Sequence, residues 1–129
     1  MITVDASALL AILLQEPEAA NFEAVLIAAG GGVIAPVNYW EVMVRAASAR
    51  GAEGRAAAEA LLAALDVEVV PTGPEQARLA LDAYLRFGRG TKAGLNLGDC
   101  FAYALAGEEG DGLLFKGEDF PQTDVIAAS

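Results

Sequence analysis

Four acidic residues carry most of the chemistry that this chain could perform. Asp5, Glu41, Asp99 and Asp119 each stand where an apolar stretch ends, at the start of an expected helix or just after an expected strand. The chain of 129 residues has no histidine and one cysteine, Cys100. A Ser-His-Asp or Cys-His nucleophile system and a Cys/His zinc site are therefore excluded. Carboxylates without such partners suit a hard cation such as Mg²⁺ or Mn²⁺.

The elements that must position these acids alternate along the chain. Short apolar stretches predict strands at residues 1–4, 33–35, 67–70 and 113–115, and residues 125–126 would add a short fifth strand. Helices are expected at residues 6–14, 19–29, 37–50, 53–65 and 74–87, with a last helix that begins at Asn96 or Gly98. This alternation predicts one domain, residues 1–129, built as a three-layer α/β/α sandwich around a mainly parallel sheet of four to five strands.

Helical spacing also predicts which side chains face the core. Trp40, Met43, Val44 and Ala47 follow i, i+3, i+4, i+7 spacing and form the expected apolar stripe of the third helix. The expected core face of the last helix consists of Leu97, Cys100, Phe101, Ala104 and Leu105. Cys100 is interpreted as a small buried residue rather than a reactive thiol.

In a parallel sheet the ligand site lies beyond the carboxyl ends of the strands. Asp5 and Asp119 follow the first and fourth expected strands, while Glu41 and Asp99 lie near the starts of helices. The topology thus allows all four acids to meet at one edge. Two unit charges about 4 Å apart repel by about 4 kcal/mol at an effective dielectric near 20, so such a cluster needs a cation or a proton.

Each acid also has a purely structural interpretation. An Asp at a helix start is commonly a cap or a partner of the helix dipole. Glu41 could form an i,i+4 ion pair with Arg45, and Glu118 and Asp119 could cap a turn. Residue chemistry alone therefore leaves both interpretations open.

The bulk composition narrows the setting of the protein. The net charge of −10 argues against a general nucleic-acid surface and fits a basic partner or a cation site. The basic residues Arg78, Arg86, Arg89 and Lys92 fall together before Asp99, as a solvated helix end or a phosphate-binding rim. A lone cysteine favours a reducing compartment, and we expect the cytoplasm. No apolar run is long enough for a membrane span, and we expect no membrane association.

Four local strings resemble one family in their order along the chain. They are Val4-Asp5-Ala6-Ser7-Ala8-Leu9, Trp40-Glu41-Val42, the stretch from Leu95 to Ala106 around Asn96-Leu97-Gly98-Asp99, and Leu114-Phe115-Lys116-Gly117-Glu118-Asp119-Phe120. Together they resemble a PIN-domain ribonuclease, specifically a VapC-type toxin of a toxin–antitoxin pair. The resemblance covers essentially the whole chain, and the strings around Asp99 and Asp119 are the most specific.

The resemblance implies a Mg²⁺- or Mn²⁺-dependent endoribonuclease that cleaves structured RNA, tRNA or rRNA. Asp5 and Asp99 would be the principal metal ligands, and Glu41 and Asp119 would complete the catalytic acidic cluster. Ser7 would hydrogen-bond within the site. The resemblance also implies a homodimer and a VapB-type antitoxin that places a basic residue among the carboxylates.

Some positions stay open within this resemblance. Glu118 competes with Asp119 for the place nearest the metal, with Asp119 preferred, and Asp124 matches either a terminal family motif or a turn residue. We expect Arg86, Arg89 and Lys92 to hold RNA phosphates beside the cluster. The alternative function is a non-catalytic PIN-like binding module. An aspartyl-phosphate enzyme is disfavoured because Ser7, not an acid, stands two residues after Asp5.

Overall fold

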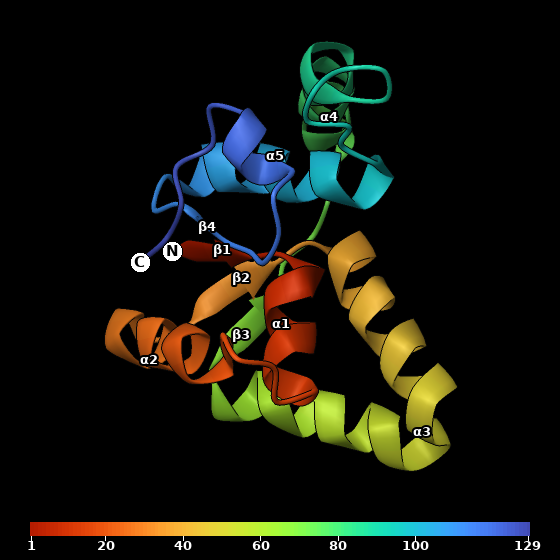
Figure 1. Cartoon of the computed structure of the whole chain (residues 1–129), viewed down its shortest axis with the longest axis vertical. Helices are drawn as coiled ribbons and strands as arrows, with labels where there is room; N and C mark the ends of the chain where they lie inside the picture. The colour runs from red at the N-terminus through yellow and green to blue at the C-terminus, as the bar shows by residue number, and fades with distance from the viewer.

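A four-stranded parallel sheet in the order β3-β2-β1-β4 lies between two layers of helices (Figure 1). The computed structural model describes all residues from 1 to 129. Its strands are β1 (Ile2–Val4), β2 (Gly32–Ile34), β3 (Val67–Val69) and β4 (Leu113–Leu114). Its helices are α1 (Ala6–Leu13), α2 (Ala19–Ala29), α3 (Pro36–Ala64), α4 (Pro74–Phe87), α5 (Leu97–Glu109) and the short 3₁₀ helix η1 (Phe120–Gln122).

The helices divide between the two faces of the sheet as a three-layer sandwich requires. In Figure 1, α1, α2 and α3 lie on one side of the strands, and α4 and α5 lie on the other. Helix α5 contacts β1 and β4 and carries α4 on its outer side, while α3 contacts β3 and α1. The predicted three-layer α/β/α fold is confirmed.

The strand order defines where a site can form. The chain moves from β1 to β2 and then β3 on one side, and returns to place β4 on the other side of β1. The direction of winding therefore changes between β1 and β4. In open parallel sheets, ligands bind beyond the carboxyl ends of the strands at such a switch point. Asp5, directly after β1, stands at this point.

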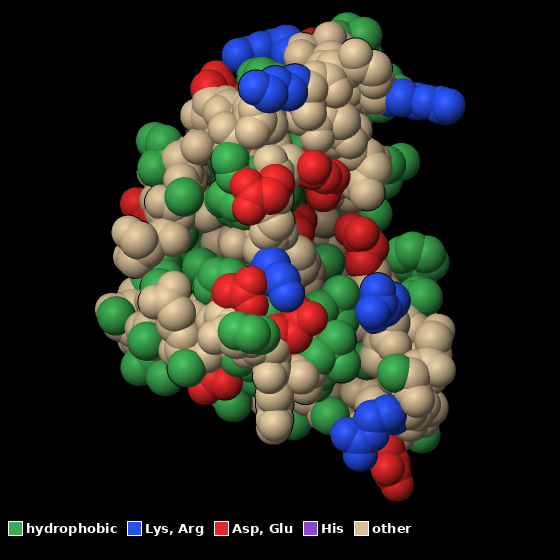
Figure 2. Space-filling view, viewed as in Figure 1, with side chains coloured by type: hydrophobic (Ala, Val, Ile, Leu, Met, Phe, Trp, Pro, Cys, Tyr) green, Lys and Arg blue, Asp and Glu red, His purple; other side chains and the backbone are tan.

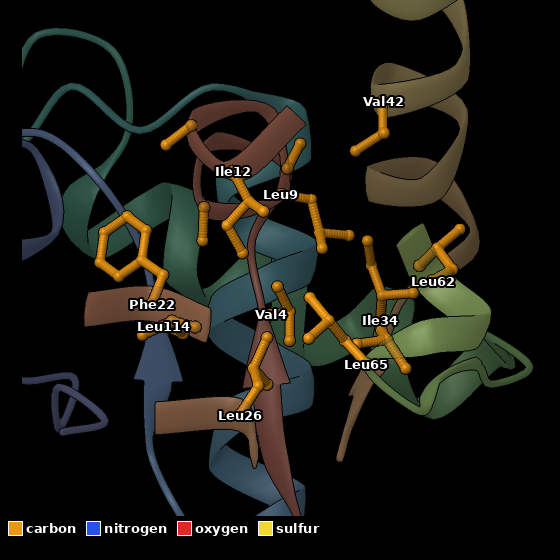
Figure 3. Packing of buried hydrophobic residues seen from close by; sticks show 14 of the residues in the cluster. Val4, Leu9, Ile12, Phe22, Leu26, Ile34, Val42, Leu62, Leu65 and Leu114 are labelled. Carbon is orange, nitrogen blue, oxygen red and sulfur yellow. The ribbon is translucent and has the colours of Figure 1, made fainter. Parts of the chain in front are cut away.

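The sheet and its first layer of helices share one apolar core. Figure 3 shows side chains from β1, α1 and α2 in contact with those from β2 and α3, Val4, Leu9 and Ile34 among them. These three are fully buried. Full burial of such a side chain contributes about 1.5–3 kcal/mol, so this core fixes the ends of the strands from which the acids project. A second core joins α4 and α5 to β4.

Two helices predicted at residues 37–50 and 53–65 form a single element with a sharp bend. The backbone leaves helical geometry at Arg50 and Gly51, where Gly51 has φ +59° and ψ −138°. A side chain would be strained in that conformation, so glycine permits the bend. The predicted fifth strand is reduced to one bridge, in which Leu113 pairs with Ala127.

The predicted core stripe of the third helix is wrong except at Met43, which is half-buried and packs against the core. Trp40 is 61% exposed and Val44 and Ala47 are also exposed, whereas Asn38, Val42 and Ala46 face the core. Leu97, expected in the core face of α5, is 64% exposed. Helical spacing of large apolar side chains predicted the wrong face, because the buried stripe begins with a polar residue, Asn38. Asn38 can be buried because it forms hydrogen bonds with Glu41 and with the carbonyl of Gly98.

None of the helices combines the length and the apolar character that a membrane span requires. Cys100 is buried, as expected, and burial raises the pKa of its thiol to about 11. The thiol is therefore protonated and unreactive at neutral pH.

Candidate active site

Asp5 caps α1 directly after the central strand. Its Oδ2 accepts hydrogen bonds from the backbone N–H of Ser7 at 3.0 Å and from the Ser7 hydroxyl at 2.6 Å. The Ser7 Oγ in turn accepts from the backbone N–H of Lys116, at 2.9 Å, in the segment after β4. Asp5 is only 5% exposed, and this burial raises the pKa of its carboxyl although the Ser7 bonds oppose the rise. Ser7 thus holds a buried carboxylate and links β1 to β4.

Glu41 reaches the same region from the second turn of α3. Its Oε1 accepts a hydrogen bond from Nδ2 of Asn38 at 3.0 Å. Partial burial raises the pKa of the Glu41 carboxyl, and the charges of Asp5 and Asp99 raise it further. Arg45 makes no ion pair with Glu41, so the alternative i,i+4 pairing is wrong. Glu41 is turned toward the acids and not toward the helix surface.

Asp99 occupies the first turn of α5 within a capping box. The Asn96 side chain accepts from the Asp99 N–H at 2.9 Å, and Asp99 Oδ2 accepts from the Asn96 N–H at 3.1 Å. Desolvation raises the pKa of Asp99 to about 6, with smaller contributions from the charges of Asp5 and Asp119. The capping role proposed as the structural alternative is therefore real, and it coexists with a place in the acidic cluster.

Asp119 stands at the start of η1, exposed and without a side-chain capping bond. Its charge acts on Asp99, whereas Glu118 is not among the groups that do so. The structure thus brings Asp119 rather than Glu118 beside the cluster. Figure 2 shows acidic side chains gathered across the middle of this face, between the α4–α5 end of the molecule and α3.

The acids approach one another without forming a closed cage. No group of three acidic or cysteine side chains is arranged to hold a metal ion by itself. Mg²⁺ does not need such a cage, since it keeps several water ligands and binds through one or two carboxylates. The donors are all oxygen, and Asp5, Glu41 and Asp99 each have a raised pKa that a nearby cation would lower. These residues therefore fit a hard divalent cation.

The predicted basic rim divides into two parts. Arg86 pairs with Asp124 at 3.0 Å and lies 4.7 Å from the ring centroid of Phe87. Tyr103 donates its hydroxyl hydrogen to the same Asp124 carboxylate, so Asp124 anchors the C-terminal segment to α4 and α5. Arg89 and Lys92 are exposed and make no ion pair. Figure 2 shows Lys and Arg side chains at the α4 end of the molecule.

Two residues at the site escaped sequence reasoning. Asn38 is fully buried and bonds to both Glu41 and the backbone of α5, and Gly98 provides the space for the Glu41 carboxylate. A detectable signal existed for Asn38: it is the one polar residue in the i, i+4, i+8 series with Val42 and Ala46. Gly98 left no such signal, because its role depends on a side chain 57 positions away.

The PIN domain family model matches residues 2–126, a span that includes all four acids. The chain belongs to the PIN-domain family. Among its relatives, ribonuclease VapC30 of Mycobacterium tuberculosis is 39% identical over 127 residues, covering 98% of this chain and 97% of the relative. Ribonuclease VapC of Mycolicibacterium smegmatis is 41% identical over 125 residues, covering 96% and 97%. This chain is therefore a PIN-domain protein of the VapC type.

The solved structures extend the likeness to the fold. The crystal structure of VapC20 from Mycobacterium tuberculosis, described as a Sarcin-Ricin loop cleaving toxin, superposes with a TM-score of 0.75. The match covers 98% of this chain and 97% of that chain at 15% identity. At this identity the likeness shows that the PIN fold is shared. The predicted family and fold are confirmed, and the VapC ribonuclease names of the relatives indicate a nuclease.

Proposed function

We propose that this chain is a Mg²⁺-dependent endoribonuclease that acts as the toxin of a toxin–antitoxin pair, with Mn²⁺ as a substitute metal. One observation carries the proposal. The charge of Asp5 raises the pKa of both Glu41 and Asp99, so the three carboxylates lie near one another at the carboxyl edge of the sheet, in a chain without histidine. The ribonuclease names of the relatives support RNA as the substrate, and structured RNA, tRNA or rRNA, is the proposed class.

Each residue of the cluster has a proposed task. A bound divalent cation would polarise a phosphate of RNA and lower the pKa of a water ligand. Asp5 and Asp99 would hold the cation directly, while Glu41 and Asp119 would complete the set directly or through water. Ser7 keeps the Asp5 carboxylate oriented through its two hydrogen bonds.

The phosphates of RNA would be held from the loop between α4 and α5. Arg89 and Lys92 are the proposed contacts, because both are exposed and unpaired there. Arg86 was expected to share this role, but its guanidinium pairs with Asp124. A contribution from Arg86 would require that exposed pair to open, which costs at most about 1 kcal/mol.

The surface supports two proposed protein partners. The net charge of −10 and the acidic face suit a VapB-type antitoxin with a basic segment. An apolar groove between α4 and α5, lined by Ala77, Ala80, Leu81, Tyr84, Leu97, Cys100 and Phe101, suits a second copy of the chain. Leu81 and Leu97 are mostly exposed in the single chain, and a homodimer would cover them.

The test uses labelled RNA with purified protein, in Mg²⁺ and in EDTA. Cleavage should require Mg²⁺ and fall at least about 100-fold in Asp5→Asn and Asp99→Asn, since each removes a charge from the cluster. Asp66→Asn is the matched control, because Asp66 is exposed and its positive φ of 57° is one that asparagine tolerates. Cleavage that persists in EDTA or in both site variants would refute the mechanism. Metal-dependent RNA binding without cleavage would favour the non-catalytic module.

A further inference from the structure

Asn38 is a polar residue at a buried position of α3 where an apolar side chain is usual. It lies in the first turn of α3 with 0% exposure, on the same buried stripe as Val42 and Ala46. Asparagine is rarely so deeply buried unless hydrogen bonds compensate for lost water. Its contacts therefore need an explanation beyond filling the core.

Both donor contacts of Asn38 go to parts of the acidic cluster. Nδ2 donates to Glu41 Oε1 at 3.0 Å and to the carbonyl oxygen of Gly98 at 3.0 Å. One amide group thus ties the Glu41 carboxylate to the backbone of α5, one residue before Asp99. The Asn38 Oδ1 is buried with no donor. Such an orphaned acceptor costs about 1–3 kcal/mol, so stability alone does not account for asparagine here.

The Glu41 carboxylate also occupies the space where a side chain at Gly98 would lie. A Cβ atom at Gly98 would lie 2.2 Å from Glu41 Oε1 and 3.0 Å from Oε2. Only a residue without a side chain leaves this space free. Glu41 is therefore held by an amide from α3 and fits a gap in the first turn of α5. The orientation of the Glu41 carboxylate therefore depends on both α3 and α5, which are far apart in the sequence and are brought together by the fold.

We propose that Asn38 is the positioning residue of the site: it fixes Glu41 against the space at Gly98, in the orientation that a divalent cation requires. The inference rests on the proposed metal-dependent function. Groups that orient metal ligands through hydrogen bonds typically change metal affinity or activity by about 10–100-fold when removed. Asn38 fills this role for a carboxylate that would otherwise swing toward solvent.

The test measures Mn²⁺ binding directly, by electron paramagnetic resonance of the free ion, in wild type, Asn38→Leu, Asn38→Ser and Gly98→Ala. Leucine has the branched shape of asparagine but is larger and cannot donate, so Mn²⁺ should bind about 10–100-fold more weakly. Serine keeps one donor and should restore part of that affinity. Gly98→Ala should weaken binding to a similar extent, because its Cβ displaces Glu41 while Asn38 stays intact. Asn21→Leu, at an exposed position on α2, is the matched control and should bind as wild type does.

Kinetics and unfolding separate positioning from structural damage. In the Asn38→Leu protein kcat should fall by a similar factor with KM for RNA unchanged, and the thermal midpoint without metal should stay near that of wild type. If Asn38→Leu does not fold, Asn38→Ser decides, since its smaller side chain fits the site but lacks the Nδ2 donor, and it should bind Mn²⁺ more weakly than wild type. Folded variants that bind Mn²⁺ within twofold of wild type would overturn the inference while leaving the proposed function intact. Wild type that binds Mn²⁺ no better than Asp5→Asn would overturn both.

Discussion

Replacing Asp99 with asparagine should stabilise the metal-free protein at neutral pH. Burial and the charges of Asp5 and Asp119 raise the pKa of this carboxyl from 3.8 to about 6. Between these values the folded protein keeps a proton that the unfolded chain has lost. Its stability therefore falls as pH rises through this window and stays lower above it. Asparagine removes the charge, and its amide oxygen can still accept the bond from the Asn96 N–H.

The size of the effect follows from the same difference in pKa. A rise from 3.8 to about 6 corresponds to about 3 kcal/mol of unfolding free energy, at about 1.36 kcal/mol per pH unit. Asp99 is partly exposed, so solvent screening reduces this figure. We expect a gain of about 1–2 kcal/mol for Asp99→Asn near neutral pH. Near pH 5 the gain should be clearly smaller, because the wild-type carboxyl is then largely protonated in the folded state.

Urea unfolding in EDTA at about pH 5 and about pH 7.5 measures this difference, with both values above the isoelectric point of about 4.2. Asp66→Asn serves as the control, since it removes an exposed charge far along the chain and should show no comparable gain at neutral pH. Saturating Mg²⁺ should reverse the order, because a cation that binds the folded state stabilises wild type more than the variant. An Asp99→Asn protein no more stable than wild type at about pH 7.5 without metal would refute the reasoning.

Three further predictions concern the neighbours of the cluster. Ser7→Ala should lower the unfolding free energy by about 1–3 kcal/mol and raise the pKa of Asp5, measured by urea unfolding and carboxyl NMR; unchanged values would contradict the bonds described above. Asp119→Asn should lower the pKa of Asp99 in an NMR titration, whereas Glu118→Gln should not, and the opposite pattern would reverse their assignment. The double variant Arg89→Ala, Lys92→Ala should reduce the slope of log binding constant against log salt concentration for RNA by about 1.4. Arg86→Ala should leave this slope unchanged, because Arg86 pairs with Asp124. An equal reduction of the slope in both proteins would disprove the division of the basic rim.

The order of strands and helices could be predicted because each has a strong local signal. Asn96 caps α5, one of the two starts that the sequence allowed, and α4 spans Pro74–Phe87 as predicted. Alternation of short apolar strands with helices then implied a parallel sheet, whose carboxyl edge collects residues that follow each strand. That rule allowed Asp5, Glu41 and Asp99 to meet at one edge, and the charge of Asp5 does reach both other acids in the structure.

The side of α3 that faces the core could not be predicted from the spacing of its apolar residues. Trp40 and Val44 are larger and more apolar than Asn38, so a hydrophobic pattern placed them inside, although both are exposed. Burial of Asn38 becomes favourable only when Gly98, on a distant helix, supplies an acceptor. Contacts between residues 60 positions apart have no periodic signature, so this part of the site needed the fold.

Each of the three acids Asp5, Glu41 and Asp99 has a polar partner close by in the sequence. Asp5 is held by Ser7, Glu41 by Asn38 and Asp99 by Asn96, each two or three residues away. Every one of these bonds lowers the pKa of its carboxyl and so opposes burial and mutual repulsion.

Because Ser7, Asn38 and Asn96 are local partners, only some of the contacts of the site depend on the tertiary fold. Because each acid has a stabilising donor two or three residues away, part of its surroundings comes from its own segment of the chain. The fold then adds the convergence of the three segments and two long-range bonds, from Asn38 to the carbonyl of Gly98 and from the Lys116 N–H to Ser7. A bound cation would offset the repulsion among the carboxylates. Removing the cation, or one of the acids, should therefore change the free energy of unfolding as well as catalysis.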